Sequence, residues 1–356
     1  MSRWGWIGIA ATALLVSTAP QAAAATWADE PLPERDTSAA LTSAASGDGA
    51  TWAFGSWSTS MPQQHSIAYL RDQHGWTEVP TPDIGRLDDA VVVSADDVWA
   101  IGADAKYGFG SSLHWDGAQW TEAGFTAPGN RNGARGIEAL GTDDVWAVGS
   151  SYDDEAGTGR GLAQHWDGSA WRDVPVPQRA GNWTFSDVTG SAPDDVWAVG
   201  NDGGYPAQGL AMHWNGQAWT EVPVPDVELG ELRAVQLTEA QSLAADDVWA
   251  TGNVHDSSGD TTTFEPLLLH WDGQTWSYVD APRDAGARQD LVRAGDELWS
   301  LGERLLHFDG TGWRQQDGPP AGAAVGGTEL ADGRLLTVGS SGGYPDVNPF
   351  VSVRQN

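Results

Sequence analysis

A phrase of seven residues, Asp-Asp-Val-Trp-Ala-x-Gly, recurs along this chain and constrains its fold more than any other feature. Full copies occupy 96–102, 143–149, 194–200 and 246–252, and weaker copies surround Trp52, Trp299 and Leu336. The tryptophans at 52, 99, 146, 197, 249 and 299 are 47, 47, 51, 52 and 50 residues apart. A period of this length indicates one supersecondary unit that is repeated and stacked on its neighbours. The pattern predicts seven such units.

Each unit is predicted to form four short strands. In residues 134–177 the apolar runs are 134–140, 144–149, 161–166 and 170–176. The last two runs are joined by Asp167-Gly168, a dipeptide that favours tight hairpin turns, and similar turns recur in the other units. No long stretch has helical periodicity. Many short strands with regular turns, in units of this length, favour a β-propeller.

The two ends of the chain together supply the last unit. Its apolar runs at 323–329, 334–339 and 350–354 are not followed by a fourth. The missing strand is found at the other end, because Thr26–Pro33 resembles the fourth strand and proline-rich exit at Trp219–Pro225. Pairing of the two ends would remove an open sheet edge. We therefore predict an all-β fold, a single seven-bladed β-propeller of four-stranded blades over residues 26–356, whose last blade is closed by the N-terminal strand.

The repeat resembles those of secreted bacterial β-propeller proteins, similar to kelch and galactose-oxidase-type propellers, over essentially residues 26–356. Kelch units usually carry paired glycines after the second strand, whereas this repeat has one. WD40 units end their third strand in Trp-Asp, as His165-Trp166-Asp167 does, but also carry a Gly-His pair that is absent here. The resemblance implies the propeller fold. Propellers include enzymes, lectins and scaffolds, so the function has to come from particular residues.

Residues 1–25 have the pattern of a secretory signal peptide. Arg3 precedes an apolar run, Ile7–Val16, which is shorter than the roughly 20 residues that span a bilayer, and Ala22–Ala25 offers small residues for cleavage. The alternative is an uncleaved membrane anchor. We expect a secreted, extracellular protein without membrane insertion. The chain has no cysteine, which excludes disulfides and cysteine-ligated metals.

The formal charge of the chain is −31. Such a charge repels phosphate backbones and keeps an exported protein soluble. We therefore expect no nucleic-acid partner. The expected partner is an extracellular glycan or protein, bound by a monomer.

Most tryptophans and histidines obey the repeat, and a repeated residue is most simply explained by a repeated structural need. The tryptophans of the second and fourth strands are predicted to pack between blades. Each of five repeated histidines is predicted to bond to an aspartate of its own or a neighbouring blade: His114, His165, His213, His270 and His307. The Asp-Asp pairs are assigned to turns, where a carboxylate can accept backbone N–H bonds.

The loops between the second and third strands are long and differ between units, and they share one end of the propeller with the links between blades. Variable loops on a rigid scaffold are where binding residues tend to lie. The predicted ligand-binding residues at this end are Trp57, Trp183, Tyr107, Tyr152, Tyr205, Tyr344, Asp153, Asp154, His255 and Asp256. Trp57 and Trp183 are the expected anchors, because no repeat explains them. The alternative is that these rings only cover their own blades.

Signals for catalysis are few. The chain has no Gly-x-Ser-x-Gly, no His-Glu-x-x-His and no phosphate-binding loop. The copper site of galactose oxidase needs a Tyr–Cys crosslink, which this chain cannot form. No catalytic residue, cofactor or metal is assigned. A recognition module is the first hypothesis. A carbohydrate-active enzyme, a lyase or hydrolase that uses acids and His255 on the same face, is the second, and a purely structural role is the third.

Overall fold

The computed structural model describes residues 26–355 except 61–62, 104–109, 126–130, 205, 226–232, 258, 260 and 344. The innermost strands are β2 (Ser38–Gly47), β6 (Arg86–Ser94), β10 (Arg131–Gly141), β14 (Trp183–Ala192), β18 (Arg233–Ala244), β22 (Arg288–Ala294) and β26 (Ala324–Glu329). The second strands are β3 (Ala50–Ser60), β7 (Asp97–Ala103), β11 (Asp144–Asp153), β15 (Asp195–Asp202), β19 (Asp247–Asp256), β23 (Glu297–Gly302) and β27 (Leu335–Ser341).

The third strands are β4 (Gln63–Asp72), β8 (Gly110–Trp115), β12 (Thr158–Trp166), β16 (Gly209–Trp214), β20 (Thr263–Trp271), β24 (Leu305–Phe308) and β28 (Asn348–Gln355). The outermost strands are β5 (Gly75–Glu78), β9 (Trp120–Ala123), β13 (Trp171–Asp173), β17 (Trp219–Glu221), β21 (Trp276–Tyr278), β25 (Trp313–Gln316) and β1 (Thr26–Glu30). One 3-10 turn, η1, spans Arg283–Ala285.

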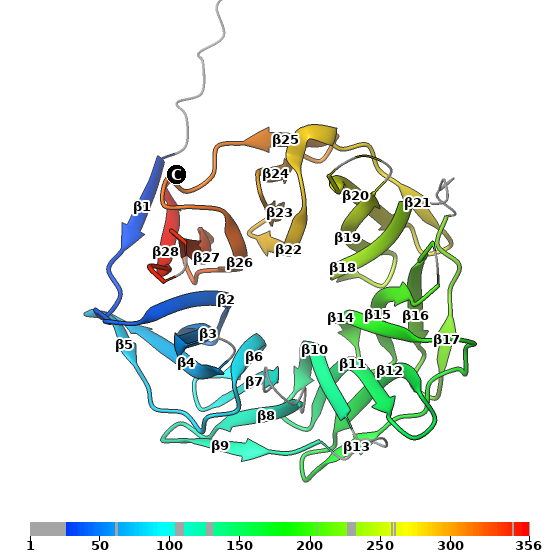
Figure 1. The fold of residues 1–356 in the computed structure, drawn as a ribbon, viewed down its shortest axis with the longest axis horizontal. Coiled ribbons are helices and arrows are strands. Elements are labelled where there is room, and N and C mark those ends of the chain that lie inside the picture. Colours follow the sequence, from blue (N-terminus) through cyan, green and yellow to red (C-terminus); the bar gives the residue numbers. More distant parts are fainter. Residues whose placement is uncertain are drawn as a thin grey trace, which may run out of the picture.

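The antiparallel sheets stand in a ring (Figure 1). Five are separate four-stranded sheets, and the eight-stranded sheet consists of β22–β25 and of β26, β27, β28 and β1, joined by the single pair Gly302↔Ala324. A cavity lined by residues of all seven innermost strands lies at the centre of the ring, and we call this space the channel. We number the blades 1 to 7 by their innermost strands, from β2 to β26. We call the end with the loops between second and third strands the loop end, and the opposite end the turn end.

The N-terminal strand closes the ring as predicted. In Figure 1, β1 lies beside β28, and the register runs from Thr26↔Gln355 to Glu30↔Val351. The carboxylate of Glu30 then joins blade 7 to blade 1, because it accepts hydrogen bonds from Arg71 at 2.8 and 2.6 Å and from Trp76 at 2.8 Å. The hydrogen bond from Arg71 lowers the pKa of Glu30. The outer edge of the last sheet is thus paired and also tied to the first blade.

The repeated tryptophans pack between blades, as expected. The ring of Trp146 in blade 3 meets Trp219 of blade 4 edge-on, with centroids 5.4 Å apart, and Trp197 meets Trp276 of the next blade in the same way at 5.3 Å. The second-strand rings are almost completely buried. Burial of such large rings in the wedge between twisted sheets is a main source of stability for the ring.

The second aspartate of each Asp-Asp pair is a partner of the repeated histidine. In blade 3, Asp144 Oδ1 lies 2.8 Å from His165 Nε2 and accepts a hydrogen bond of 3.1 Å from Trp146 Nε1, while the two rings pack at 4.5 Å. The same His–Asp pair occurs in blades 2, 4 and 5 at 2.9, 2.7 and 2.9 Å. The predicted histidine–aspartate bond is therefore confirmed in these blades. Bonding to backbone N–H groups is instead a property of the Asp-Gly turns, where Asp167 accepts from Ser169 and Ala170 at 3.0 Å each.

The first aspartate of the pair can be compared directly with the second. Asp143 makes no hydrogen bond or ion pair within the described residues, and its Cβ lies close to Gly168, where an added Cβ would come within 2.9 Å of it. We expect Asp144→Ala to lower the free energy of unfolding by about 1–2 kcal/mol, because it removes the bonds to His165 and Trp146. Asp143→Ala keeps that Cβ and should change stability by less than about 0.5 kcal/mol. Urea unfolding of both variants measures the difference, and equal costs would contradict the assignment.

Candidate functional site

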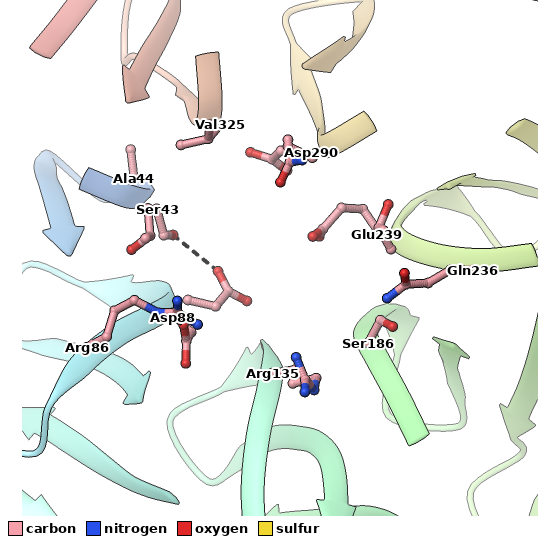
Figure 2. Close-up of a pocket in the computed structure, with 14 residues that line it drawn as sticks. Ser43, Ala44, Arg86, Asp88, Arg135, Ser186, Gln236, Glu239, Asp290 and Val325 are labelled. Carbon is pink, nitrogen blue, oxygen red and sulfur yellow. Dashed lines mark hydrogen bonds and ion pairs between the residues drawn. The ribbon is translucent and has the colours of Figure 1, made fainter. Parts of the chain in front are cut away.

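Every innermost strand carries a β-bulge at the same level. The register with the second strand shifts by one residue in all seven blades, for example between Leu87 and Asp89 in blade 2 and between Ala134 and Gly136 in blade 3. A bulge inserts an unpaired residue and re-aims the side chains beside it. The bulged residues are Thr42, Asp88, Arg135, Ser186, Thr238, Gln289 and Val325, and all seven line one cavity of about 340 Å³ inside the channel (Figure 2).

The glycine that ends the repeated phrase makes room for this bulge. A Cβ on Gly149 would lie 2.0 Å from the carbonyl oxygen of Gly133, and one on Gly102 would lie 2.2 Å from that of Arg86. At the equivalent glycines of the other blades, an added Cβ would likewise lie 2.0–2.4 Å from a carbonyl oxygen at the innermost strand. No side chain fits at such a distance, so glycine is needed for the close approach of the two strands. The sequence repeat and the lining of the channel therefore have one cause.

Aspartates follow the bulge in alternate blades and join neighbouring blades. Asp290 in blade 6 accepts a 2.6 Å hydrogen bond from the N–H of Leu291 and a 2.8 Å bond from Gly327 N–H in blade 7. Asp89 of blade 2 bonds Ile137 N–H of blade 3 at 3.0 Å, and Asp187 of blade 4 bonds Ala240 N–H of blade 5 at 2.8 Å. The bulge would otherwise leave these N–H groups without partners. These three aspartates are thus structural.

The carboxyl groups of the channel hold their protons more tightly than usual. Burial raises the pKa of Asp89 to about 6 and of Asp290 to about 7. Burial, together with the negative charges of Asp187 and Asp89, raises the pKa of Glu138 to about 8. The pKa values of Asp187 and Glu239 are raised by burial and by the other channel carboxylates.

Charged groups on the same innermost strands face these carboxyls: Arg86 and Asp88 on β6, and Arg135 on β10. Burial also raises the pKa of Asp88, although Arg86 and Arg135 oppose this.

These shifts predict that the protein is more stable in mild acid than at alkaline pH. The unfolded chain titrates its carboxyls near pH 4, so the folded state binds more protons from about pH 4 up to about pH 8, and stability falls as the pH rises through this range. Below about pH 4 stability falls again, as Glu30 and Asp332 become protonated, because hydrogen bonds from Arg71 and Arg334 hold their pKa values down. The melting temperature should therefore be higher near pH 5.5 than near pH 8.

The variant Glu138→Gln distinguishes the effect of the channel carboxyls on pH-dependent stability from the general effect of surface charge. This variant removes Glu138, whose pKa is raised to about 8. Its melting temperature should therefore change less between about pH 6.5 and pH 8 than that of the wild type. An unchanged dependence on pH in this variant would show that the channel carboxyls are not its source.

Three arginines gather where the channel opens at the loop end, between blades 2 and 3. A second cavity of about 400 Å³ is lined by Arg86, Arg131 and Arg135, and it joins the channel cavity through Arg86, Asp88 and Arg135. Arg86 pairs with Asp88, and Arg131 pairs with Asp154 while its guanidinium lies over the ring of Tyr152 at 4.8 Å. We call the two joined cavities the channel mouth.

Three of the predicted ligand-binding residues lie together at this place. Tyr152 lines the second cavity, Asp154 pairs with Arg131, and Asp153 lies at the end of β11. Asp153 binds the turn of its own hairpin, because its Oδ1 accepts hydrogen bonds from Glu155 and Ala156 at 2.9 and 3.0 Å. Tyr152 and Asp154 are thus placed to contribute to a site, whereas Asp153 shapes the hairpin.

The two expected anchors are not free rings. Trp183 is not in a link but is the first residue of β14, and it is 4% exposed. It packs edge-on against Phe185 and covers Gly161, where a Cβ would come within 2.1 Å of the indole. The indole of Trp183 is therefore packed against protein, which leaves little of the ring for a ligand. Trp57 is half-buried between two side chains, His65 stacked at 4.4 Å and Arg35 at 5.1 Å.

The other predicted residues lie elsewhere on the loop end. His255 in blade 5 packs edge-on against Phe264 at 4.7 Å, and burial lowers its pKa. Asp256 pairs with Arg233 at 3.4 Å. Neither residue lines the channel cavity. Tyr107, Tyr205 and Tyr344 lie outside the described residues.

Sequence reasoning missed the residues of the bulges, because the innermost strands were interpreted only as apolar runs. A signal was present: two adjacent residues, many of them polar, interrupt the apolar pattern once in each run, as in Ser186-Asp187, Thr238-Glu239 and Gln289-Asp290. In the part of the chain that the structure describes, no group of three or more histidine, aspartate or glutamate side chains is placed to hold a metal ion. No helix among the described residues is long and apolar enough to cross a membrane.

No protein-family model matches the sequence. A search of curated proteins finds no relative. Similar solved structures include YCF48 from Cyanidioschyzon merolae, with 14% identity and a TM-score of 0.53 over 92% of this chain and 98% of that one. A puromycin-hydrolyzing peptidase of Mycobacterium tuberculosis has 14% identity and a TM-score of 0.55 over 87% of this chain. The fucose-specific lectin from Aleuria aurantia has 13% identity and a TM-score of 0.49 over 83% of this chain and 99% of that one.

The chain spans half the length of the peptidase. At these identities the likeness to the first two structures shows the fold alone. A ring of four-stranded antiparallel sheets around a channel, with solved structures that share it, defines this protein as a β-propeller.

Proposed function

We propose that this propeller is a secreted recognition module that binds an extracellular carbohydrate or protein ligand at the channel mouth, on the loop end. In this proposal the scaffold is rigid and monomeric, and the variable side chains of the channel mouth select the ligand. Neither a metal nor a cofactor takes part.

The observation that carries the proposal is the variety of the seven bulged residues. The backbone is equivalent at all seven positions, so a structural need would select one residue type, as it does at the glycine opposite. The bulges instead carry Thr42, Asp88, Arg135, Ser186, Thr238, Gln289 and Val325, and these seven side chains converge on one cavity (Figure 2). A ring of different donors and acceptors on a fixed frame is suited to a ligand with an asymmetric set of polar groups.

The shape of the loop end supports the same assignment. In blade 3 the second and third strands stay paired from Gly149 out to Asp153, and in blade 5 from Gly252 out to Asp256, whereas in blade 4 pairing ends at Asn201, one residue after Gly200. Blade 1 has a similar long hairpin, which ends near Ser60. Long hairpins in alternate blades give the channel mouth a raised and uneven rim.

A screen of two matched variants tests the proposal. The channel variant combines Ser186→Ala, Gln236→Ala and Gln289→Ala. The control variant combines Gln119→Ala, Gln217→Ala and Gln274→Ala, which are exposed amides of the Asp-Gly and Asn-Gly turns at the turn end. On a glycan array and an array of extracellular proteins, the channel variant should bind any ligand of the wild type at least about tenfold more weakly, because contacts at the centre of a site carry most of the affinity.

The control variant should bind like the wild type, and both variants should melt like it. Loss of binding in the control variant alone would place the interface at the turn end and contradict the proposal.

A carbohydrate-active enzyme on the same face is the second candidate, and one observation favours it. Glu239 lines the cavity beside Asp290, and its pKa is raised by burial and by the neighbouring carboxylates. A carboxyl whose pKa is raised holds its proton more readily and can donate it to a glycosidic oxygen. Glu239 therefore replaces His255 as the candidate acid, because His255 does not line this cavity.

Binding and turnover separate these two functions. If the protein is an enzyme, the wild type should release reducing ends from a glycan that it binds, and Glu239→Gln should abolish the release while retaining the binding. The conservative amide keeps the size of the side chain and removes only its acid. A wild type that binds a glycan for hours without releasing reducing ends is a recognition module alone.

A further inference from the structure

Arg135 is an unusual cation for this protein. The chain has 18 lysines and arginines against 49 aspartates and glutamates, so carboxylates are available to almost every cation. Most arginines of the described chain form an ion pair with a carboxylate, for example Arg71 with Glu30 and Arg334 with Asp332. Arg288 and Arg293 bond to backbone carbonyls instead. Within the described residues, Arg135 and Arg304 have no hydrogen bond or ion pair.

The position of Arg135 is set by the fold and not by chance exposure. It is the bulged residue of β10 and lies four residues further along the strand than Arg131, or roughly 13 Å. It lines both cavities of the channel mouth, and its side chain is exposed within them (Figure 2). Its guanidinium makes no hydrogen bond or ion pair among the described residues and has only a longer-range attraction to Asp88, so it is available to an anionic ligand group.

The charges near Arg135 favour an anion despite the net charge of the chain. Arg86 and Arg131 are neutralised by Asp88 and Asp154, so the guanidinium of Arg135 supplies the remaining local charge. Ions screen more distant carboxylates beyond about 8 Å at physiological salt. The carboxyls deeper in the channel have raised pKa values, so part of their population is neutral and repels an anion less.

The remaining lining of the second cavity suits a sugar. The half-buried Asn132 and Ser150 offer an amide and a hydroxyl, and Tyr152 offers a ring. A cavity of about 400 Å³ has the size of a site for one monosaccharide unit, whereas a flat surface of a protein partner could not enter it. Hydroxyl groups bond to short polar side chains, while the C–H faces of a sugar pack on aromatic rings.

We propose that the channel mouth binds an acidic sugar residue, one that carries a carboxylate or sulfate, and that Arg135 is the anchor of the acidic group. Arg135 holds the anion, Asn132 and Ser150 bond the ring hydroxyls, and Tyr152 packs against the sugar. This inference rests on the proposed recognition function and names the class of its ligand.

Calorimetric titration with three matched probes tests this inference: trigalacturonate, its neutral methyl ester, and a sulfated galactose trisaccharide. The wild type should bind at least one of the two acidic probes about tenfold more tightly than the ester, because a bidentate contact from arginine to an anion is among the stronger hydrogen-bonded interactions. The stronger of the two acidic probes identifies the group as carboxylate or sulfate. Equal affinity for the ester and both acidic probes would overturn the inference.

Arg304→Gln is the matched control for Arg135→Gln. Arg304 is exposed in blade 6, has no ion pair among the described residues and does not line the channel mouth. Arg135→Gln should lower the affinity for the acidic probe about tenfold and leave that for the ester unchanged, while Arg304→Gln should change neither. Arg135→Lys should restore part of the loss. An equal loss in both glutamine variants would assign the effect to net charge and overturn the inference.

The outcome distinguishes this inference from the proposed function. Suppose that the wild type binds a neutral glycan or an acidic hexapeptide, and that the Ser186/Gln236/Gln289 variant loses this binding while Arg135→Gln retains it. That result would support the recognition function and refute the acidic-sugar ligand. Absence of any ligand for the wild type on both arrays would refute both.

Discussion

The close approach of two strands at one glycine is the constraint on which the rest of this structure depends. In every blade a glycine of the second strand lies against a carbonyl oxygen at the innermost strand, so close that a Cβ would not fit between them. The innermost strand can then bulge toward the axis. The bulge leaves an N–H group unpaired, and an aspartate after the bulge satisfies it in alternate blades. Repeat, channel lining and contacts between blades thus follow from one steric requirement.

This arrangement combines residues that repeat from blade to blade with a channel lining that differs between blades. The tryptophans, the His–Asp pairs and the glycines recur because each solves a packing problem that every blade shares. The bulged residue lines the channel. Two of the seven, Thr42 and Thr238, also donate to carbonyl oxygens of their second strands at 3.3 and 3.2 Å, and the identity of the bulged residue still differs between blades. A propeller built in this way can change the chemistry of its channel lining by substitutions at seven positions.

Much of the fold could be predicted from the sequence, because the repeat reports local needs directly. The spacing of Trp52, Trp99 and Trp146 gives the blades, and the likeness of Thr26–Pro33 to a fourth strand gives the closure that the pairing of Glu30 with Val351 confirms. The site was harder to predict. Trp183 breaks the repeat because blade 4 uses a larger ring to cover Gly161, so irregularity alone did not indicate a binding residue.

Arg135 shows why the rest of the site could not be predicted. Its meaning depends on a bulge that aims it inward and on the convergence of seven strands that are far apart in the sequence. Neither the hydrophobic pattern of β10 nor the composition of the chain contains that information. The carboxyls of the channel are a similar case, since the pKa values of Asp89 and Asp290 depend on how the ring surrounds them.

The alternation of the aspartates has a consequence for how the ring is held together. Asp89, Asp187 and Asp290 join blades 2 to 3, 4 to 5 and 6 to 7, and seven is an odd number, so blade 1 is left without such a bond. At the equivalent position blade 1 has Ser43, whose hydroxyl reaches Asp89 at 3.2 Å, and its outer side is held by Glu30. Blade 1 also bonds blade 2 through Thr42, whose hydroxyl donates to the carbonyl oxygen of Leu87 at 2.5 Å. A ring with an odd number of blades that are joined in pairs must hold one blade by other means, and in this propeller the strand that closes the ring also holds the unpaired blade.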